Sequence, residues 1–186
     1  MSRTPEGSHF DRCIALIGLR GAGKTAVGRA LAALAGRSLV DLDDAIVLAA
    51  GTSIALIFER EGEAGFRQRE RDALFAVLES PPGVLALGGG AVLDPRNVKK
   101  LREQAIVIWL TAPPAVLAAR IAGDERSVLS RPSLTGRLPA DEMETLATQR
   151  EGPYRAAADY AINTDGLSPA EIAEQIVERL GLPRTP

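Results

Sequence analysis

Short apolar runs alternate with longer stretches of mixed polarity along almost the whole chain. Each run is rich in β-branched or other apolar residues and is too short for a helix, so it predicts a strand buried in a sheet. The runs are CIALI, SLVDL, VLAL, AIVIWL and DYAI, at residues 13–17, 38–42, 84–87, 105–110 and 159–162. Because sequence of helical length follows each run, the order of elements predicts an α/β fold with a parallel sheet.

The stretches between these runs have the apolar spacing of amphipathic helices. The predicted helices cover residues 25–35, 53–61, 63–78, 96–104, 115–122, 140–158 and 169–180. With 186 residues, the chain is long enough for one well-packed domain. We expect that domain at residues 13–182, with a flexible leader at 1–12 and a short tail at 183–186.

Composition and charge exclude several classes of function. A net charge of -2 and an isoelectric point near 5.6 offer no basic surface for nucleic acid. No apolar stretch approaches the roughly 20 residues of a membrane span, and the polar start lacks the apolar core of a signal peptide. We therefore expect a cytoplasmic protein with no membrane partner. His9 is the single histidine and lies in the leader, which excludes a His-based triad and a His-ligated zinc site.

The segment from Gly18 to Thr25, GLRGAGKT, matches the phosphate-loop pattern G-x-x-x-x-G-K-[ST]. It follows the first predicted strand and precedes the first predicted helix, where such a loop belongs. Its glycines let backbone N–H groups converge, and the helix start adds unpaired N–H groups and a positive dipole end. Lys24 is placed to reach the β- and γ-phosphates of a nucleotide, and the Thr25 hydroxyl to ligate Mg²⁺. The residues expected at the nucleotide phosphates are Gly18, Gly21, Ala22, Gly23, Lys24, Thr25 and Ala26.

Two aspartates follow the second predicted strand, as Asp41-Leu-Asp43. Residues two apart on a strand point the same way, so we expect both carboxylates at the carboxyl end of the sheet. One would lie near the metal and the other near an acceptor hydroxyl. A strand end without a ligand is the alternative interpretation of this short pattern, and the adjacent Asp44 is interpreted as a helix N-cap.

Several segments, in order, resemble the shikimate kinase family. They are LIGLRGAGKTAVGRALA, DLD, SIALIFEREGEAGFRQRE, LGGGAV, RPSL and QREGPYRAAAD, and the match covers about residues 13–180. The resemblance implies a three-layer phosphate-loop kinase sandwich, with a five-stranded parallel sheet of order 2-3-1-4-5 and a mobile lid at about 123–137. It also implies transfer of the ATP γ-phosphate to the 3-hydroxyl of shikimate, in chorismate and aromatic amino acid biosynthesis, with Mg²⁺ as cofactor. We expect a monomer.

The resemblance assigns roles to the matching residues that would bind ATP, Mg²⁺ and the reacting hydroxyl. Lys24 and Thr25 hold ATP and Mg²⁺, and Asp41 orders the water shell of the metal. Asp43 bonds the acceptor hydroxyl and serves as its base. Arg131, in the lid, reaches the transferring phosphate, so that Lys24, Asp43 and Arg131 form the catalytic set. A lid of this kind excludes water and brings a cation to developing charge.

The same resemblance places Arg67, Gly89, Gly90 and Arg150 at the substrate. Two arginines suit a carboxylate because each guanidinium donates two parallel hydrogen bonds. Glycine leaves its backbone N–H open to a hydroxyl. Glu70, three residues after Arg67, is expected to orient that arginine across one helical turn.

Two other functions stay open at this point. One is another small-molecule kinase, although a gluconate kinase would place a histidine soon after the paired aspartates, and an adenylate kinase would have further lid and base-recognition motifs. The other is a ligand-sensing module without catalysis, which would come with a DNA-binding domain for which the leader offers no helix-turn-helix. The joint presence of Asp43, Arg67 and Arg131 favours catalysis.

Overall fold

A five-stranded parallel sheet forms the centre of the computed structural model, which describes residues 12–123 and 139–185. The strands are β1 (Cys13–Ile17), β2 (Leu39–Asp41), β3 (Val84–Ala86), β4 (Ala105–Thr111) and β5 (Tyr160–Asn163). They lie in the order β2-β3-β1-β4-β5, and every neighbouring pair is parallel. The predicted fold class and strand order are therefore confirmed.

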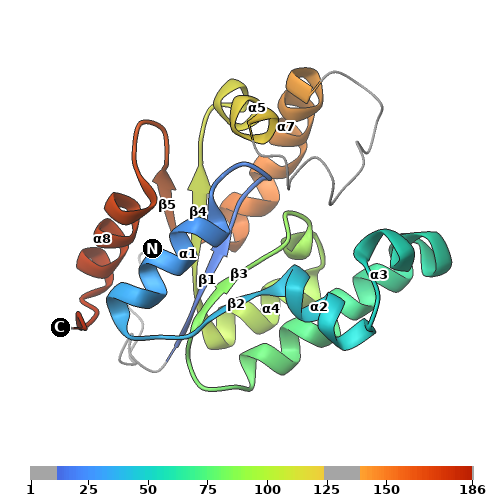
Figure 1. The fold of residues 1–186 in the computed structure, drawn as a ribbon, viewed down its shortest axis with the longest axis horizontal. Helices are drawn as coiled ribbons and strands as arrows, with labels where there is room; N and C mark the ends of the chain where they lie inside the picture. The colour runs from blue at the N-terminus through green and yellow to red at the C-terminus, as the bar shows by residue number, and fades with distance from the viewer. Residues whose placement is uncertain (1–11, 124–138, 186) are drawn as a thin grey trace.

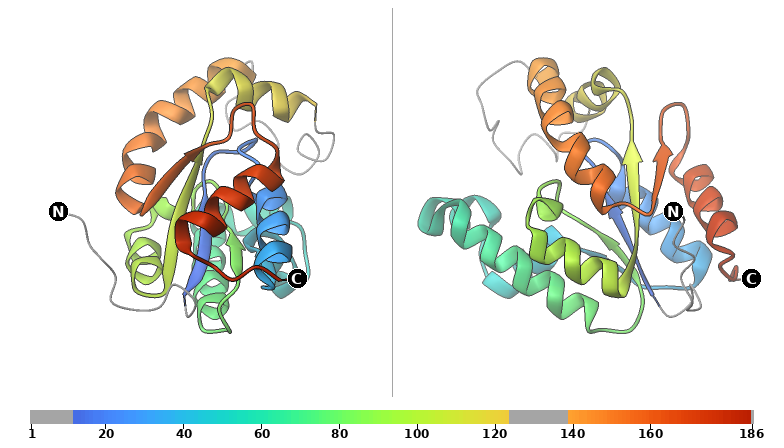
Figure 2. Two further views of the ribbon diagram at one scale, coloured as in Figure 1. Left: turned by 90° about the vertical axis from the view of Figure 1, so that its left-hand side faces the viewer. Right: turned by 180° about the vertical axis from the view of Figure 1, so that it is seen from behind.

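Helices cover both faces of this sheet (Figures 1 and 2). The left view of Figure 2 shows α1 (Lys24–Ala35) and α8 (Pro169–Leu180) on one face, and α4 (Pro95–Gln104) and α7 (Pro139–Ala157) on the other. Next to α7 packs α5 (Pro114–Ala122). The helices α2 (Leu42–Ala50) and α3 (Ile54–Leu78) extend toward one side of the sheet (Figure 1). The 3₁₀ turn η2 (Ala91–Leu93) follows β3. The arrangement is the expected three-layer sandwich.

The central strand β1 lies in the middle of the hydrophobic core. All of its residues are buried, because strands flank it on both sides and helices cover both faces. Cys13, its first residue, belongs to this core. Burial raises the pKa of the Cys13 thiol, although the Gly83 backbone and the charge of Arg37 oppose the shift. The thiol is thus a small buried hydrophobe.

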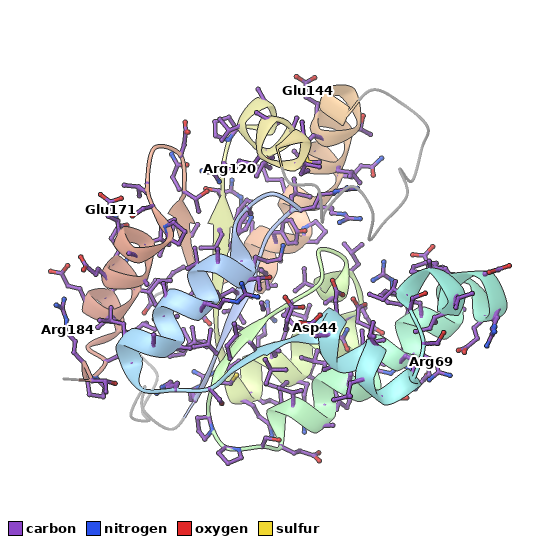
Figure 3. All side chains as sticks on the ribbon, viewed as in Figure 1. Asp44, Arg69, Arg120, Glu144, Glu171 and Arg184 are labelled. Atoms are coloured by element: carbon purple, nitrogen blue, oxygen red, sulfur yellow. The ribbon has the colours of Figure 1, made fainter. Side chains whose placement is uncertain are left out.

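One helix is absent from the predicted helical ranges, although the interpretation of Asp44 as an N-cap implied a helix start near it. This helix is α2, which begins directly after Asp41 and carries apolar side chains on most of its surface, including Leu48 at 85% exposed. Its two buried residues, Leu42 and Ile46, are four positions apart, as on one face of a helix, but its outer face is apolar as well. Asp41 is the N-cap of this helix and accepts from the Asp43 N–H at 3.1 Å. The interpretation of Asp44 as the N-cap is therefore wrong, and Asp44 lies in the first turn of α2 (labelled in Figure 3).

The long helix α3 is interrupted at Gly62, whose φ of 67° and ψ of -172° are not helical. The two helices predicted at 53–61 and 63–78 are the two halves of α3. Ser53 caps the first half by accepting from the Leu56 N–H at 3.3 Å. Across the break, Arg69 makes a two-pronged ion pair with Glu61, with both contacts at 2.8 Å.

Two predicted segments fall mainly outside the described residues. They are the leader, of which only Arg12 is described, and the lid, of which only Gly123 is described. Arg12 Nη2 donates to the carbonyls of Arg102 and Ala105 at 2.8 and 2.6 Å, so the chain is attached to the sheet just before β1. Among the described helices, none combines the length and the apolar character needed to cross a bilayer.

Candidate active site

The loop between β1 and α1 is built by glycine conformations that other residues avoid. Gly21 has a φ of 80°, and a Cβ at this position would lie 2.7 Å from the Leu117 carbonyl oxygen. Gly23, with a φ of 85°, is the N-cap of α1 and leaves the helix start without a side-chain cap. In the loop, the Ala22 N–H donates to the Leu19 carbonyl at 3.2 Å. The result is a tight turn that leads directly into a helix N-terminus, as a phosphate-binding loop requires.

The Lys24 side chain turns back over this loop. Its Nζ donates to the carbonyl oxygens of Gly18 and Leu19, each at 3.0 Å. These contacts hold the ammonium group above the residues expected at the nucleotide phosphates. Ala26, the last of that predicted set, is exposed in the first turn of α1.

Thr25 and the two aspartates form a connected group beside the loop. The Thr25 hydroxyl donates to Asp41 Oδ2 at 2.7 Å, while Asp41 Oδ1 accepts from the Asp43 N–H at 3.1 Å. The strand β2 ends at Asp41, so Asp43 belongs to the first turn of α2. The expectation that both aspartates extend from one strand is therefore wrong, because the chain changes from strand to helix between them. Both side chains are nevertheless half-buried.

Arg67 is held on α3 by two glutamates. Its Nη1 donates to Glu70 Oε2 at 2.7 Å and its Nη2 to Glu63 Oε1 at 3.3 Å, and Glu70 is only 1% exposed. Partial burial alone would lower the pKa of Arg67. The charges and hydrogen bonds of Glu70 and Glu63 outweigh that effect and raise the pKa above its ordinary value. The predicted contact between Arg67 and Glu70 is confirmed, and the guanidinium stays charged.

The glycine loop after β3 is where the predicted substrate residues meet. A Cβ on Gly90 would lie 2.5 Å from Arg67 Nη2, so the arginine of α3 reaches this backbone only because the side chain is absent. The neighbouring Gly89 carbonyl accepts from Arg150 Nη1 at 2.8 Å. Arg67 and Arg150 therefore approach the same short loop from α3 and α7.

Two residues that the sequence analysis did not identify contact the glycine loop or the phosphate loop. Tyr154, on α7, donates its hydroxyl to the Gly89 carbonyl at 2.6 Å and is 2% exposed. Arg120, on α5, donates to Thr164 Oγ1 at 2.9 Å and to the Thr164 carbonyl at 2.7 Å, and more distantly to the Gly21 carbonyl at 3.5 Å. It thus connects the phosphate loop to the turn after β5 (labelled in Figure 3). For Tyr154 the available signals were its position four residues after Arg150, on the same helical face, and its place in the segment QREGPYRAAAD.

The predicted site residues thus form two clusters in the described part of the chain. One contains Lys24, Thr25, Asp41 and Asp43 around the phosphate loop, and the other contains Arg67, Gly89, Gly90 and Arg150. Arg131 lies outside the described residues.

Comparison with known sequences identifies a family. The shikimate kinase family model matches residues 20–181. The shikimate kinase of Rhodopirellula baltica is 42% identical over 163 residues, which cover 88% of this chain and 87% of the relative. The shikimate kinase of Symbiobacterium thermophilum is 42% identical over 167 residues, or 90% of this chain and 95% of the relative.

Solved structures agree with this result. The shikimate kinase from Acinetobacter baumannii in complex with shikimate has a TM-score of 0.84 and 36% identity, over 91% of this chain and 92% of that chain. A gluconokinase from Sinorhizobium meliloti has a TM-score of 0.59 and 21% identity, over 92% and 93% of the two chains, and shows a shared fold alone. Because the family model and the relatives span most of its length, the chain belongs to the shikimate kinase family.

Proposed function

We propose that this protein transfers the γ-phosphate of ATP to the 3-hydroxyl of shikimate. The observation that carries the proposal is the convergence of Arg67 and Arg150 on the Gly89–Gly90 backbone. Two guanidinium groups beside glycine backbone suit a small acceptor that has a carboxylate at one end and hydroxyls at the other.

Arg67 retains N–H donors for a ligand although it already pairs with two glutamates. A guanidinium has five N–H donors, and the two glutamates engage one N–H on each terminal nitrogen of Arg67. Glu70 is buried and stays within a helical turn of Arg67, so it fixes the orientation of the fork. In this proposal the remaining N–H groups of Arg67, together with those of Arg150, bind the shikimate carboxylate.

ATP lies along the phosphate loop in this proposal. Backbone N–H groups from Gly21 to Ala26 would face its phosphates, as the positive end of α1 favours negative charge there. The Lys24 ammonium, now on two loop carbonyls, would move to the β- and γ-phosphates. Arg131 would add a cation from the lid, a role that rests on the family resemblance.

The oxygen atoms of Thr25 and Asp41 fit a Mg²⁺ site. They already share a 2.7 Å hydrogen bond, and oxygen ligands are those that Mg²⁺ prefers. Among the described side chains, in residues 12–123 and 143–185, no three of His, Cys, Asp or Glu gather into a metal cage. On the basis of their shared hydrogen bond, we propose that Thr25 holds the ion directly and Asp41 through water, with nucleotide phosphates completing its shell. The bound ion would supply positive charge to the phosphate oxygens.

Asp43 is proposed to receive the proton of the acceptor hydroxyl. The freed oxygen forms a bond to the γ-phosphorus, the bond from that phosphorus to the β-phosphate oxygen breaks, and ADP leaves. Asp43 is suited to this role because its backbone is fixed by Asp41, the residue that also accepts from Thr25. Acceptor and donor sites are thus connected through one carboxylate. We further propose that the protein works as a cytoplasmic monomer.

A coupled ADP-release assay tests this function. Purified protein with Mg-ATP is offered shikimate, gluconate and nucleoside monophosphates in parallel, and we expect turnover of shikimate alone. Asp43→Asn keeps the size of the side chain but cannot accept the proton, so it should lower kcat by about 10²-fold or more while shikimate still binds.

Asp44→Asn is the matched control, because Asp44 is the exposed neighbour on the same helical turn. Its kcat should equal that of the unmodified protein. Turnover of gluconate without shikimate would show that the acceptor has been misassigned. A normal kcat in Asp43→Asn would instead remove Asp43 from the proton-transfer step.

A further inference from the structure

The Gly89 carbonyl receives two hydrogen bonds from one helix. Arg150 Nη1 donates at 2.8 Å and the Tyr154 hydroxyl at 2.6 Å. The two residues are four positions apart, so their side chains extend from the same face of α7. The proposed function assigns Arg150 to the substrate and gives no task to Tyr154.

The burial of Tyr154 makes its hydrogen bond a fixed feature of the site. The residue is 2% exposed, and its ring lies 5.7 Å from that of Trp109 on β4. Burial raises the pKa of the phenol, although the Arg150 charge and hydrogen bonding partly oppose the shift, so the hydroxyl remains a donor. A buried hydroxyl without a partner is costly, and Gly89 provides that partner.

Holding this carbonyl also determines the direction of the next N–H. The Gly89 carbonyl and the Gly90 N–H belong to one planar trans peptide and point in opposite directions. With the carbonyl directed toward α7, the Gly90 N–H is directed away from it. Arg67 also packs against Gly90, where a Cβ would lie 2.5 Å from its Nη2.

The same glycine borders the phosphate loop. A Cβ on Gly89 would lie 3.1 Å from Arg150 Nη1 and 3.5 Å from both the Tyr154 hydroxyl and the Gly18 carbonyl. That Gly18 carbonyl accepts from Lys24. The Gly89 peptide is thus enclosed by α7 on one side and the donor loop on the other, and a rotation of it would disturb both arginines of the acceptor site.

We infer that Tyr154 is a positioning residue for the acceptor: its buried hydroxyl fixes the Gly89–Gly90 peptide and, through it, the Gly90 N–H and Arg150. The inference rests on the proposed function for the identity of the acceptor. An arginine that binds a substrate carboxylate exchanges partners during each turnover. A tyrosine that touches no substrate can hold the same carbonyl throughout.

Tyr154→Phe tests this inference, with Tyr160→Phe as the matched control. Each change removes one hydroxyl, and Tyr160, on β5, is the other tyrosine of the chain. We expect Tyr154→Phe to raise the KM for shikimate by about three-fold to ten-fold, the range for one lost neutral hydrogen bond. The kcat and the KM for ATP should change by less than about two-fold, because the donor side keeps its contacts. Tyr160→Phe should leave all three constants unchanged.

A second measurement does not depend on catalysis. In protein labelled with ¹⁵N-glycine, the Gly90 amide resonance should move in Tyr154→Phe and stay in place in Tyr160→Phe. Equal acceptor KM values in the two variants would overturn the inference, even where the resonance moves. A parallel fall in kcat, ATP affinity and thermal stability would also overturn it, because it would indicate lost packing. If the unmodified protein uses another acceptor, the proposed function fails, and the KM for that acceptor decides the role of Tyr154.

Discussion

The donor and acceptor halves of the site are assembled in different ways. The donor half is nearly contiguous: Gly18 to Gly23 form one loop whose shape comes from glycine conformations, Lys24 and Thr25 begin α1, and Asp41 is added from the next strand along the chain. The acceptor half joins residues from α3, the loop after β3, and α7, and Asp43 of α2 lies where this half meets the donor half. The first half depends on local backbone geometry, and the second depends on how the helices pack.

This difference determines whether the groups on each side stabilise the transition state or bind the substrate. On the donor side, backbone N–H groups and Lys24 are proposed to face charge that moves during transfer. On the acceptor side, the arginines are proposed to face a carboxylate whose charge does not change. Loss of a donor-side group should therefore reduce kcat, whereas loss of an acceptor-side arginine should raise KM.

Lys24→Met should have the largest effect. Methionine has a similar length but no charge, so the phosphates lose a cation while the fold is kept. We expect kcat to fall by at least about 10³-fold, with the KM for shikimate nearly unchanged. Steady-state kinetics in both substrates and a thermal melt measure this. Lys99→Met, on the exposed face of α4, is the control and should be fully active. Full activity in Lys24→Met would contradict the proposal that Lys24 and the phosphate loop bind the nucleotide.

Arg67→Ala should have an intermediate effect, on the KM for shikimate more than on kcat. A charge-assisted hydrogen bond contributes about 1.5 to 3 kcal/mol, so the KM for shikimate should rise by about ten-fold to a hundred-fold. The kcat should fall much less, because the carboxylate does not take part in the transfer. Arg60→Ala, an exposed arginine of the same helix, is the control. A variant that lost kcat at constant KM would contradict the division between the two halves.

Asp94→Asn should have the smallest effect and involves neither half directly. Asp94 caps α4 and pairs with Arg71 of α3 at 2.9 Å and with Arg96 at 2.8 Å. Hydrogen bonding from Arg96, and then from Arg71, outweighs desolvation and lowers the pKa of Asp94 from 3.8 to about 2. Asparagine can still cap the helix, so the free energy of unfolding at pH 7 should fall by only about 1 kcal/mol.

The pH dependence of that difference follows from the lowered pKa. The carboxylate stabilises the fold above its unfolded-state pKa near 3.8, and this contribution is lost as the pH falls toward about 2. Denaturant unfolding at pH 7, 4 and 3 should therefore show Asp94→Asn approaching the unmodified protein. Asp165→Asn, at an exposed turn, should match the unmodified protein at each pH. A difference that grew toward low pH would contradict the ion-pair account.

The sequence by itself determined the strands, their order through the family resemblance, and the donor loop. Gly18 to Thr25 could be identified because glycine spacing fixes the local backbone and needs no distant partner. The break at Gly62 and the Arg67–Glu70 contact were predicted for the same reason, since both lie within a few residues of their cause.

Only the tertiary structure decided how the two halves of the site are held together. Asp43 proved to lie on a helix because Asp41 ends β2 and caps α2, so the strand stops earlier than the sequence pattern indicated. The contacts of Tyr154 with Gly89 and of Arg120 with Thr164 join residues that are 65 and 44 positions apart. No local pattern specifies such a pair, because a buried donor takes whichever acceptor the packing of helices on the sheet brings within reach.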